Sequence, residues 1–190
     1  MIGMKVPDVK FYIRERDSSN DENNYNWFVR DTEDYFANKR VVVFSLPGAF
    51  TPTCTGRQLP DYEFAYGEIR NLGIDHVYCV SVNDSFVMNA WYEYLGLGFK
   101  TIPLPDGNGM FTGLMNQLVL KENLGFGYRS WRYAMVVNNG IIEAFWEEPG
   151  KEDNCEEDPY GETHPDKVLE YLLKSAEGGI LNQKGESNNE

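Results

Sequence analysis

The segment of this chain best suited to chemistry is PGAFTPTC, from Pro47 to Cys54, which directly follows the apolar run VVVF at 41–44. Pro52 is suited to starting a helix, so Cys54 is expected in the first turn of that helix. Unpaired N–H groups and the positive end of the helix dipole favour a thiolate over a thiol at this position. We therefore predict a nucleophilic Cys54 and a thiol-dependent enzyme.

Alternating strands and helices are expected to hold this cysteine in place. The run 41–46 is almost continuously apolar, as in a central parallel strand. Apolar residues then recur at helical spacing, which predicts a helix from Pro52 or Thr53 to Asn71, ended by Gly73. The other elements expected in this half are an edge strand at 4–13, a polar loop at 17–26, a helical turn at 31–37, a strand at 76–82, a helix at 85–95 and a strand at 100–104.

The second half is expected to close with a hairpin and a helix. The turn signal NNG at 138–140 separates two apolar segments and predicts strands at 132–137 and 141–147. Pro165 is suited to opening a last helix, whose apolar positions would face the core. From Glu177 onward the chain is rich in Gly, Asn, Gln and Glu, so fraying is expected there.

Composition limits the class of protein. The 190 residues suffice for one domain, expected at 1–176, with a polar, disordered tail at 177–190. With 17 basic and 30 acidic residues the net charge is -13, which argues against a nucleic-acid partner because phosphate binding needs a positive surface. No apolar run approaches a membrane span and no signal-peptide pattern is present. Three cysteines without a C-x-x-C pair then suggest a reducing, cytoplasmic location.

Three separated motifs resemble those of one family. The strand–helix–strand pattern followed by a hairpin and a closing helix is typical of a thioredoxin-like α/β fold. PGAFTPTC resembles the peroxiredoxin pattern P-x-x-x-T-x-x-C, with flanks similar to the type-V subfamily, and VSVND at 80–84 and RYAMVVNNG at 132–140 match the same family. The resemblance covers residues 4–175. It implies a central mixed sheet with flanking helices and an added N-terminal strand, and a thiol-dependent peroxidase.

The resemblance also implies roles for four residues. Cys54 would be the nucleophile that becomes a sulfenic acid, and Thr51 would orient the peroxide and the thiolate. Pro47 would shield the sulfur, and Arg132 would hold the thiolate with a permanently charged, planar fork of donors. Plainer readings stay open: a turn or helix-cap hydroxyl for Thr51, a rigid turn for Pro47 and a strand-end charge for Arg132. Arg129 is expected to be a supporting charge.

The other two cysteines bear on how the enzyme is recycled. Cys79 lies in the apolar strand VYCVSV and is expected to be an inert core thiol. Cys155 lies in the acidic stretch KEDNCEEDPYGE, where an exposed thiol is expected. In atypical two-cysteine relatives a cysteine in the corresponding loop resolves the sulfenic acid, but the surrounding carboxylates would disfavour the Cys155 thiolate. The competing route is one-cysteine recycling by glutathione or glutaredoxin, supported by likeness to bacterial forms with a fused glutaredoxin domain; thioredoxin is the other candidate reductant.

Other candidate sites are weaker. His76 and His164 have no neighbouring ligand at metal-site spacing, so we expect no metal and no cofactor. A Cys–His acyl-transfer dyad with Cys54 would leave Pro47 and Thr51 unexplained. The sequence DGNG at 106–109 is favourable for phosphate but is better explained as a plain turn, because no following helix carries a lysine.

The sequence thus predicts an enzyme that reduces hydrogen peroxide and small organic hydroperoxides. The alternative is a non-catalytic peroxide sensor or redox-interaction protein that passes oxidation to a partner, suggested by an exposed Cys155. The resemblance further implies a homodimer through the face beside the active-site loop. Phe50 and the helix that carries Trp91, Tyr92 and Tyr94 could supply an apolar patch there, although core packing explains the helix equally well.

Overall fold

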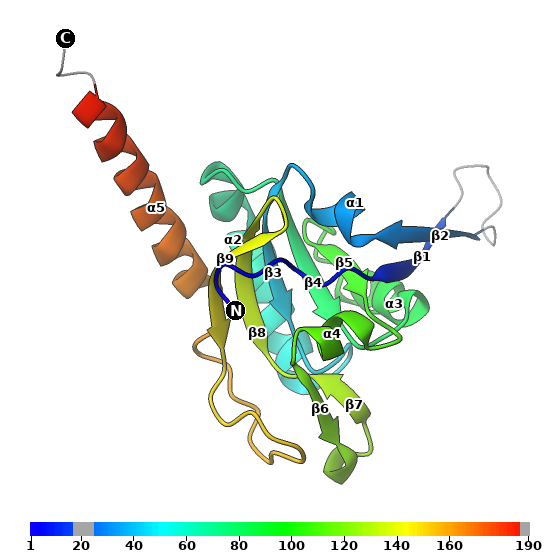
Figure 1. The fold of residues 1–190 in the computed structure, drawn as a ribbon. Coiled ribbons are helices and arrows are strands. Elements are labelled where there is room, and N and C mark those ends of the chain that lie inside the picture. The colour runs from blue at the N-terminus through cyan, green and yellow to red at the C-terminus, as the bar shows by residue number, and fades with distance from the viewer. Residues whose placement is uncertain (17–24, 187–190) are drawn as a thin grey trace.

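A five-stranded mixed sheet carries the fold, with strand order β5-β4-β3-β8-β9. The computed structural model describes residues 1–16 and 25–186 (Figure 1). β3 (Arg40–Ser45) is parallel to β4, and β4 is parallel to β5, whereas β8 and β9 are antiparallel to their neighbours. The bounds of the other four strands are β4 (His76–Ser81), β5 (Ile102–Pro105), β8 (Tyr133–Asn138) and β9 (Ile141–Glu147). The expected thioredoxin-like fold with a central mixed sheet is confirmed.

Both faces of this sheet are buried, because side chains of successive strand residues point to opposite sides. Val42 and Phe44 belong to a core cluster with α2 (Leu59–Asn71), α3 (Ser85–Leu95) and α5 (Pro165–Glu186). Val41 and Val43 belong to a second cluster with Phe11 and with residues of α1 (Thr32–Phe36) and α4 (Met110–Leu114) on the other face. Near-continuous burial of β3 explains why its sequence is apolar throughout.

The N-terminal region differs from the expected single edge strand. β1 (Lys10–Arg16) pairs with β2 (Tyr25–Asp31) in a separate antiparallel ribbon, visible beside α3 in Figure 1. Ahead of this ribbon, Lys5 forms a bridge with Ile141 of the edge strand β9. β2 escaped prediction because three consecutive apolar residues in it are exposed, so it lacks the alternation of a half-buried strand; they are Trp27, Phe28 and Val29. The expected polar loop at 17–26 falls mostly outside the described residues.

Two further differences concern the second half. A ribbon of β6 (Leu118–Lys121) and β7 (Gly127–Ser130), joined through the short helix η2 (Glu122–Leu124), occupies a region for which the sequence predicted no element. α5 extends to Glu186, beyond the point at which fraying was expected, and its far end projects away from the sheet (Figure 1). The division into a domain at 1–176 and a tail stays a prediction.

The long connection from β9 to α5 is fastened at its two ends by one carboxylate. Glu148 is 2 % exposed, and its Oε1 accepts hydrogen bonds from the backbone N–H of Gly161 and of Thr163 at 2.8 Å each, and from Thr163 Oγ1 at 2.7 Å. Burial alone raises the pKa of Glu148, but these hydrogen bonds outweigh burial and hold the pKa below its ordinary value. Residues 149–160 therefore form a loop whose two ends are joined by the hydrogen bonds of Glu148.

Glu148→Gln should destabilise the protein at neutral pH. The neutral amide cannot accept three charge-assisted hydrogen bonds, so we expect a loss of about 1–3 kcal/mol in the free energy of unfolding. Because the carboxyl pKa is depressed in the folded state, its contribution is complete above the unfolded pKa and is lost as pH falls through the folded pKa. Urea titrations should show the two proteins converging in acid. Glu93→Gln, on the exposed side of α3, is the matched control; equal stabilities at pH 7 would contradict the assignment.

Candidate active site

Cys54 lies where the chain passes from β3 into the helix that covers it. The helix begins at Pro52 and continues through the π-helical turn η1 (Cys54–Gln58) into α2, so the predicted helix from Pro52 or Thr53 to Asn71 is confirmed. The π turn is seen in the bond from the Leu59 N–H to the Cys54 carbonyl, five residues back. The Cys54 side chain is fully buried.

Sheet order brings Arg132 to this cysteine. β3 and β8 are antiparallel neighbours with Ser45 opposite Tyr133, so the end of β3 lies beside the start of β8. Arg132 immediately precedes β8, is 2 % exposed, and places Nη1 3.7 Å from Cys54 Sγ. The alternative reading of Arg132 as a surface strand-end charge is therefore wrong.

Gln58 is a member of the site that the sequence analysis missed. It is fully buried one turn after Cys54, and its Oε1 accepts a hydrogen bond from Arg132 Nη1, the atom that also contacts the sulfur. Its Nε2 donates to the carbonyl of Ser45 at 3.1 Å, which fixes the orientation of the amide. The available signal was the spacing of four residues from Cys54, which places both side chains on one face of a helix.

Three consecutive residues of the β9–α5 connection hold the rest of the Arg132 guanidinium. Its Nε donates to the Pro159 carbonyl at 2.9 Å, its Nη2 is paired with the Asp158 carboxylate, and its Cζ lies 5.6 Å from the centre of the Tyr160 ring. These residues were also missed. They lie in a stretch that the sequence presents only as acidic and loop-like, with no periodicity to place it.

Pro47 and Thr51 shape the turn in front of the helix. The Thr51 hydroxyl donates to the Gly48 carbonyl at 2.7 Å, which is the turn role, while its oxygen keeps acceptor capacity. The buried Pro47 offers its carbonyl to Arg129 Nη1 at 3.4 Å. A Cβ at Gly48 would lie 2.5 Å from that Nη1, so glycine leaves room for the guanidinium. Burial lowers the pKa of Arg129, and the Cys54 sulfur opposes this shift.

A cavity of about 280 Å³ opens beside these residues. Its lining combines the turn before the helix, the β6–β7 ribbon and the loop after β9; the residues are Pro47, Thr51, Pro52, Lys121, Leu124, Phe126, Cys155, Glu156, Glu157 and Asp158. The structure thus brings Pro47, Thr51 and Cys155 to one cavity and pairs Cys54 with Arg132, neither of which is among the residues that line it.

The expectation of an exposed Cys155 is wrong. The residue is 8 % exposed and packs in a small apolar cluster with Val119 and Trp131, while its carbonyl accepts from Lys121 Nζ at 3.4 Å. Its loop folds over the β6–β7 ribbon, which was not predicted from the sequence, and this contact covers the thiol. Cys79 is fully buried, and burial raises the pKa of its thiol, as expected of a core cysteine.

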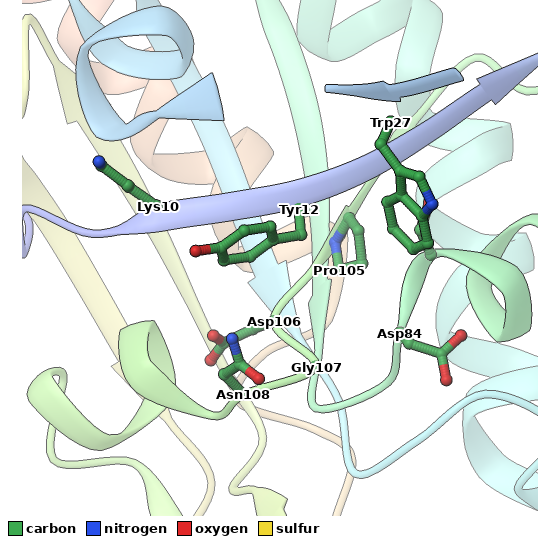
Figure 2. Close-up of a pocket in the computed structure, with 9 residues that line it drawn as sticks. Lys10, Tyr12, Trp27, Asp84, Pro105, Asp106, Gly107 and Asn108 are labelled. Carbon is green, nitrogen blue, oxygen red and sulfur yellow. The ribbon is translucent and has the colours of Figure 1, made fainter. Parts of the chain in front are cut away.

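The remaining candidates have structural roles. Asp106 caps α4 through the N–H groups of Phe111 and Thr112, and the Gly109 N–H closes the DGNG turn on the Asp106 carbonyl at 2.8 Å. Figure 2 shows Tyr12 above this turn. Tyr12 and the turn residues border a hollow of about 190 Å³. No cluster of three potential metal ligands occurs within residues 1–16 and 25–186. In the same part of the chain, no helix has the length and apolar character needed to cross a membrane.

Known proteins with similar sequences carry the same kind of domain. The Redoxin family profile matches residues 1–162. The peroxiredoxin y4vD of Sinorhizobium fredii is 57 % identical over 169 residues, covering 88 % of this chain and 89 % of that protein. A peroxiredoxin of Rhizobium etli is 55 % identical over 174 residues, covering 90 % and 96 %. The hybrid peroxiredoxin hyPrx5 of Haemophilus influenzae is 45 % identical over 175 residues, covering 90 % of this chain and 66 % of the hybrid.

Solved structures with a similar fold are also peroxiredoxins. A Plasmodium falciparum antioxidant protein, described as a 1-Cys peroxiredoxin, superposes with a TM-score of 0.84 at 35 % identity, covering 90 % of this chain and 99 % of that one. Reduced Prx3 of Vibrio vulnificus in complex with hydrogen peroxide superposes with a TM-score of 0.77 at 29 % identity, covering 90 % and 98 %. This chain belongs to the redoxin family and is a peroxiredoxin, a thiol peroxidase of the type-V kind.

Proposed function

We propose that Cys54 reduces hydrogen peroxide and small organic hydroperoxides, with Arg132 as the cation that stabilises its thiolate. The observation that carries this proposal is the 3.7 Å contact between Arg132 Nη1 and the buried Cys54 sulfur. An anionic sulfur removed from water needs a paired charge, and a guanidinium supplies one that cannot be deprotonated at neutral pH. The cavity beside Pro47 and Thr51 is the proposed approach for the peroxide.

The proposed reaction transfers two electrons from sulfur to the peroxide. The Cys54 thiolate attacks the terminal oxygen of HO–OR, the S–O bond forms as the O–O bond breaks, and the products are Cys54–SOH and RO⁻. The alkoxide, or hydroxide from hydrogen peroxide, takes a proton from water. Negative charge therefore moves from sulfur to the leaving oxygen, where fixed donors such as Arg132 are most useful.

The turn residues are proposed to complete the site. Thr51 keeps acceptor capacity on its hydroxyl oxygen and can receive the peroxide O–H, while Pro47 walls the cavity and keeps water from the sulfur. Arg129 is proposed as a supporting charge, because it contacts the Pro47 carbonyl and no contact joins it directly to the sulfur among the described residues.

Arg132→Lys should lower the second-order rate constant for hydrogen peroxide by about a hundredfold. An ammonium keeps the charge but cannot contact the sulfur, Gln58 and Asp158 together. Arg129→Lys, the matched substitution three residues earlier, should lose much less. Stopped-flow tryptophan fluorescence measures both rates. Equal losses in the two variants would contradict the ranking of these arginines.

We propose one-cysteine recycling by glutathione and glutaredoxin as the reductant route. A thiol R′SH would displace water from Cys54–SOH to give Cys54–S–SR′, and a second thiol would release Cys54 and R′SSR′. Support comes from likeness to the hybrid and 1-Cys relatives and from the fastening of the Cys155 loop, in which the Asn154 N–H donates to the Leu120 carbonyl at 2.7 Å. Cys155 borders the same cavity, which supports the competing intramolecular disulfide with thioredoxin as reductant.

Turnover of wild type, Cys54→Ser and Cys155→Ser separates these routes. Each protein is assayed with thioredoxin and, separately, with glutathione plus glutaredoxin. We expect Cys54→Ser to abolish activity and Cys155→Ser to keep the glutathione-linked rate. Loss of thioredoxin-linked turnover in Cys155→Ser, together with a Cys54–Cys155 disulfide in peroxide-treated wild type, would instead establish Cys155 as the resolving cysteine.

Partners and location are proposed on the same basis. The exposed rings of Phe50 and Tyr94, with centroids 5.7 Å apart, are the proposed centre of a homodimer interface. Trp91 is excluded from it, because it is fully buried and donates to Thr55 Oγ1 at 3.1 Å. The three cysteines are free, which fits a cytoplasmic location. The sensor alternative loses its motivating observation, since Cys155 is not exposed.

Tyr94→Asp should convert the dimer to a monomer. Tyr94 is 72 % exposed, so the substitution places a charge in the proposed interface without disturbing the core. Phe64→Asp, on a side chain of α2 that is 77 % exposed and lies outside the proposed interface, is the matched control and should remain dimeric. Light scattering at micromolar concentration gives the masses, and a monomeric wild type would refute the interface.

A further inference from the structure

Asp158 is the one carboxylate paired with Arg132 among the described residues, and it lies in the β9–α5 connection between Cys155, which borders the cavity, and Pro159. We propose that Asp158, although it lines the cavity, is a positioning residue, which acts by aiming the Arg132 guanidinium at Cys54 and not by touching the sulfur or the peroxide. This inference rests on the proposed role of Arg132 and goes beyond it, because it assigns a function to the acidic β9–α5 connection.

The geometry shows why the guanidinium needs a second edge of contacts. Nη1 serves both Cys54 Sγ and Gln58, so these contacts define one side of the planar fork. The opposite side is defined by Nη2 on Asp158 and by Nε on the Pro159 carbonyl. A long side chain held on one edge alone can rotate or change rotamer, whereas contacts on both edges fix the plane.

The anchors of Asp158 come from the same elements that carry the site. Tyr160, two residues after Asp158, donates its hydroxyl to Asp61 Oδ2 on α2 at 2.9 Å. The Arg57 guanidinium lies 5.1 Å from the centre of the Tyr160 ring. The Gly161 N–H donates to Glu148, next to the end of β9. The Asp158 side chain is 47 % exposed but its partner is buried, so its position is set by this backbone rather than by deep burial of its own.

Electrostatics separates positioning from simple activation of the thiol. Asp158 carries a negative charge, so its own charge does not attract a second negative charge on the sulfur, and any help it gives to the reaction has to pass through Arg132. Removing the Asp158 carboxylate leaves Nε on the Pro159 carbonyl as the one contact on that edge among the described residues, which weakens the hold on the guanidinium and misplaces the donor that the transition state uses. Asp158 should therefore matter for peroxide, whose O–O cleavage needs aligned donors, and not for a reagent that needs only a thiolate.

The test compares two reactions of Cys54 in the Asp158→Asn variant. Tryptophan fluorescence reports the rate of oxidation by peroxide. Mass spectrometry measures alkylation of Cys54 by iodoacetamide. We expect the hydrogen peroxide rate constant to fall by about tenfold to hundredfold while alkylation is unchanged or faster. Asp158→Glu should recover part of the peroxide rate. Glu152 is an exposed residue of the same loop, and Glu152→Gln removes one negative charge as Asp158→Asn does. This control should react with peroxide and with iodoacetamide at the wild-type rates.

A double-mutant cycle tests whether Asp158 acts through Arg132. In an Arg132→Lys background, adding Asp158→Asn should cost much less than it does in wild type, because the fork to be positioned is already gone. Full additivity would overturn the inference. A wild-type peroxide rate in Asp158→Asn would overturn it too, as would parallel losses of peroxide and iodoacetamide reactivity with a lowered melting temperature. The proposed function fails separately, if wild type itself does not reduce peroxide.

Discussion

The buried contact between Arg132 and Cys54 is the interaction on which the arrangement of this protein depends. A guanidinium that is 2 % exposed requires hydrogen-bond acceptors around its plane, because a buried charge without partners is costly. Cys54, Gln58, Asp158 and Pro159 supply them from two separate parts of the chain. The fold has to bring these parts together and keep water from the sulfur.

The topology of the sheet brings Arg132 to Cys54 and Gln58. Because β3 and β8 are antiparallel neighbours, the carboxyl end of one strand and the amino end of the other meet at one edge of the sheet. The helix that starts after β3 presents Cys54 and Gln58 there, and the residue before β8 is Arg132. Residues 78 positions apart in sequence are therefore placed by two rigid strands rather than by flexible loops.

The β9–α5 connection supplies the other acceptors of Arg132, Asp158 and Pro159. Its ends are joined at Glu148, its middle folds over the β6–β7 ribbon, and its last part wraps around Arg132. Cys155 and Asp158 are three residues apart in this connection, so the thiol at the cavity and the carboxylate on the arginine share one segment of backbone.

The sequence by itself determined the strands of the main sheet and the helix that carries Cys54, and it predicted the chemistry of this cysteine. Apolar runs, helical spacing after Pro52 and the NNG turn are short-range signals, and the resemblance of the separated motifs predicted Arg132 as the partner cation. Only the tertiary structure decided which other groups complete the site. Gln58 and Asp158 acquire their roles through contacts with Arg132 across 74 and 26 residues, and Cys155 is buried because a ribbon without a sequence signal lies against its loop. Composition near Cys155 suggested exposure, but burial depends on which surface covers a residue, and that surface exists only once the chain has folded.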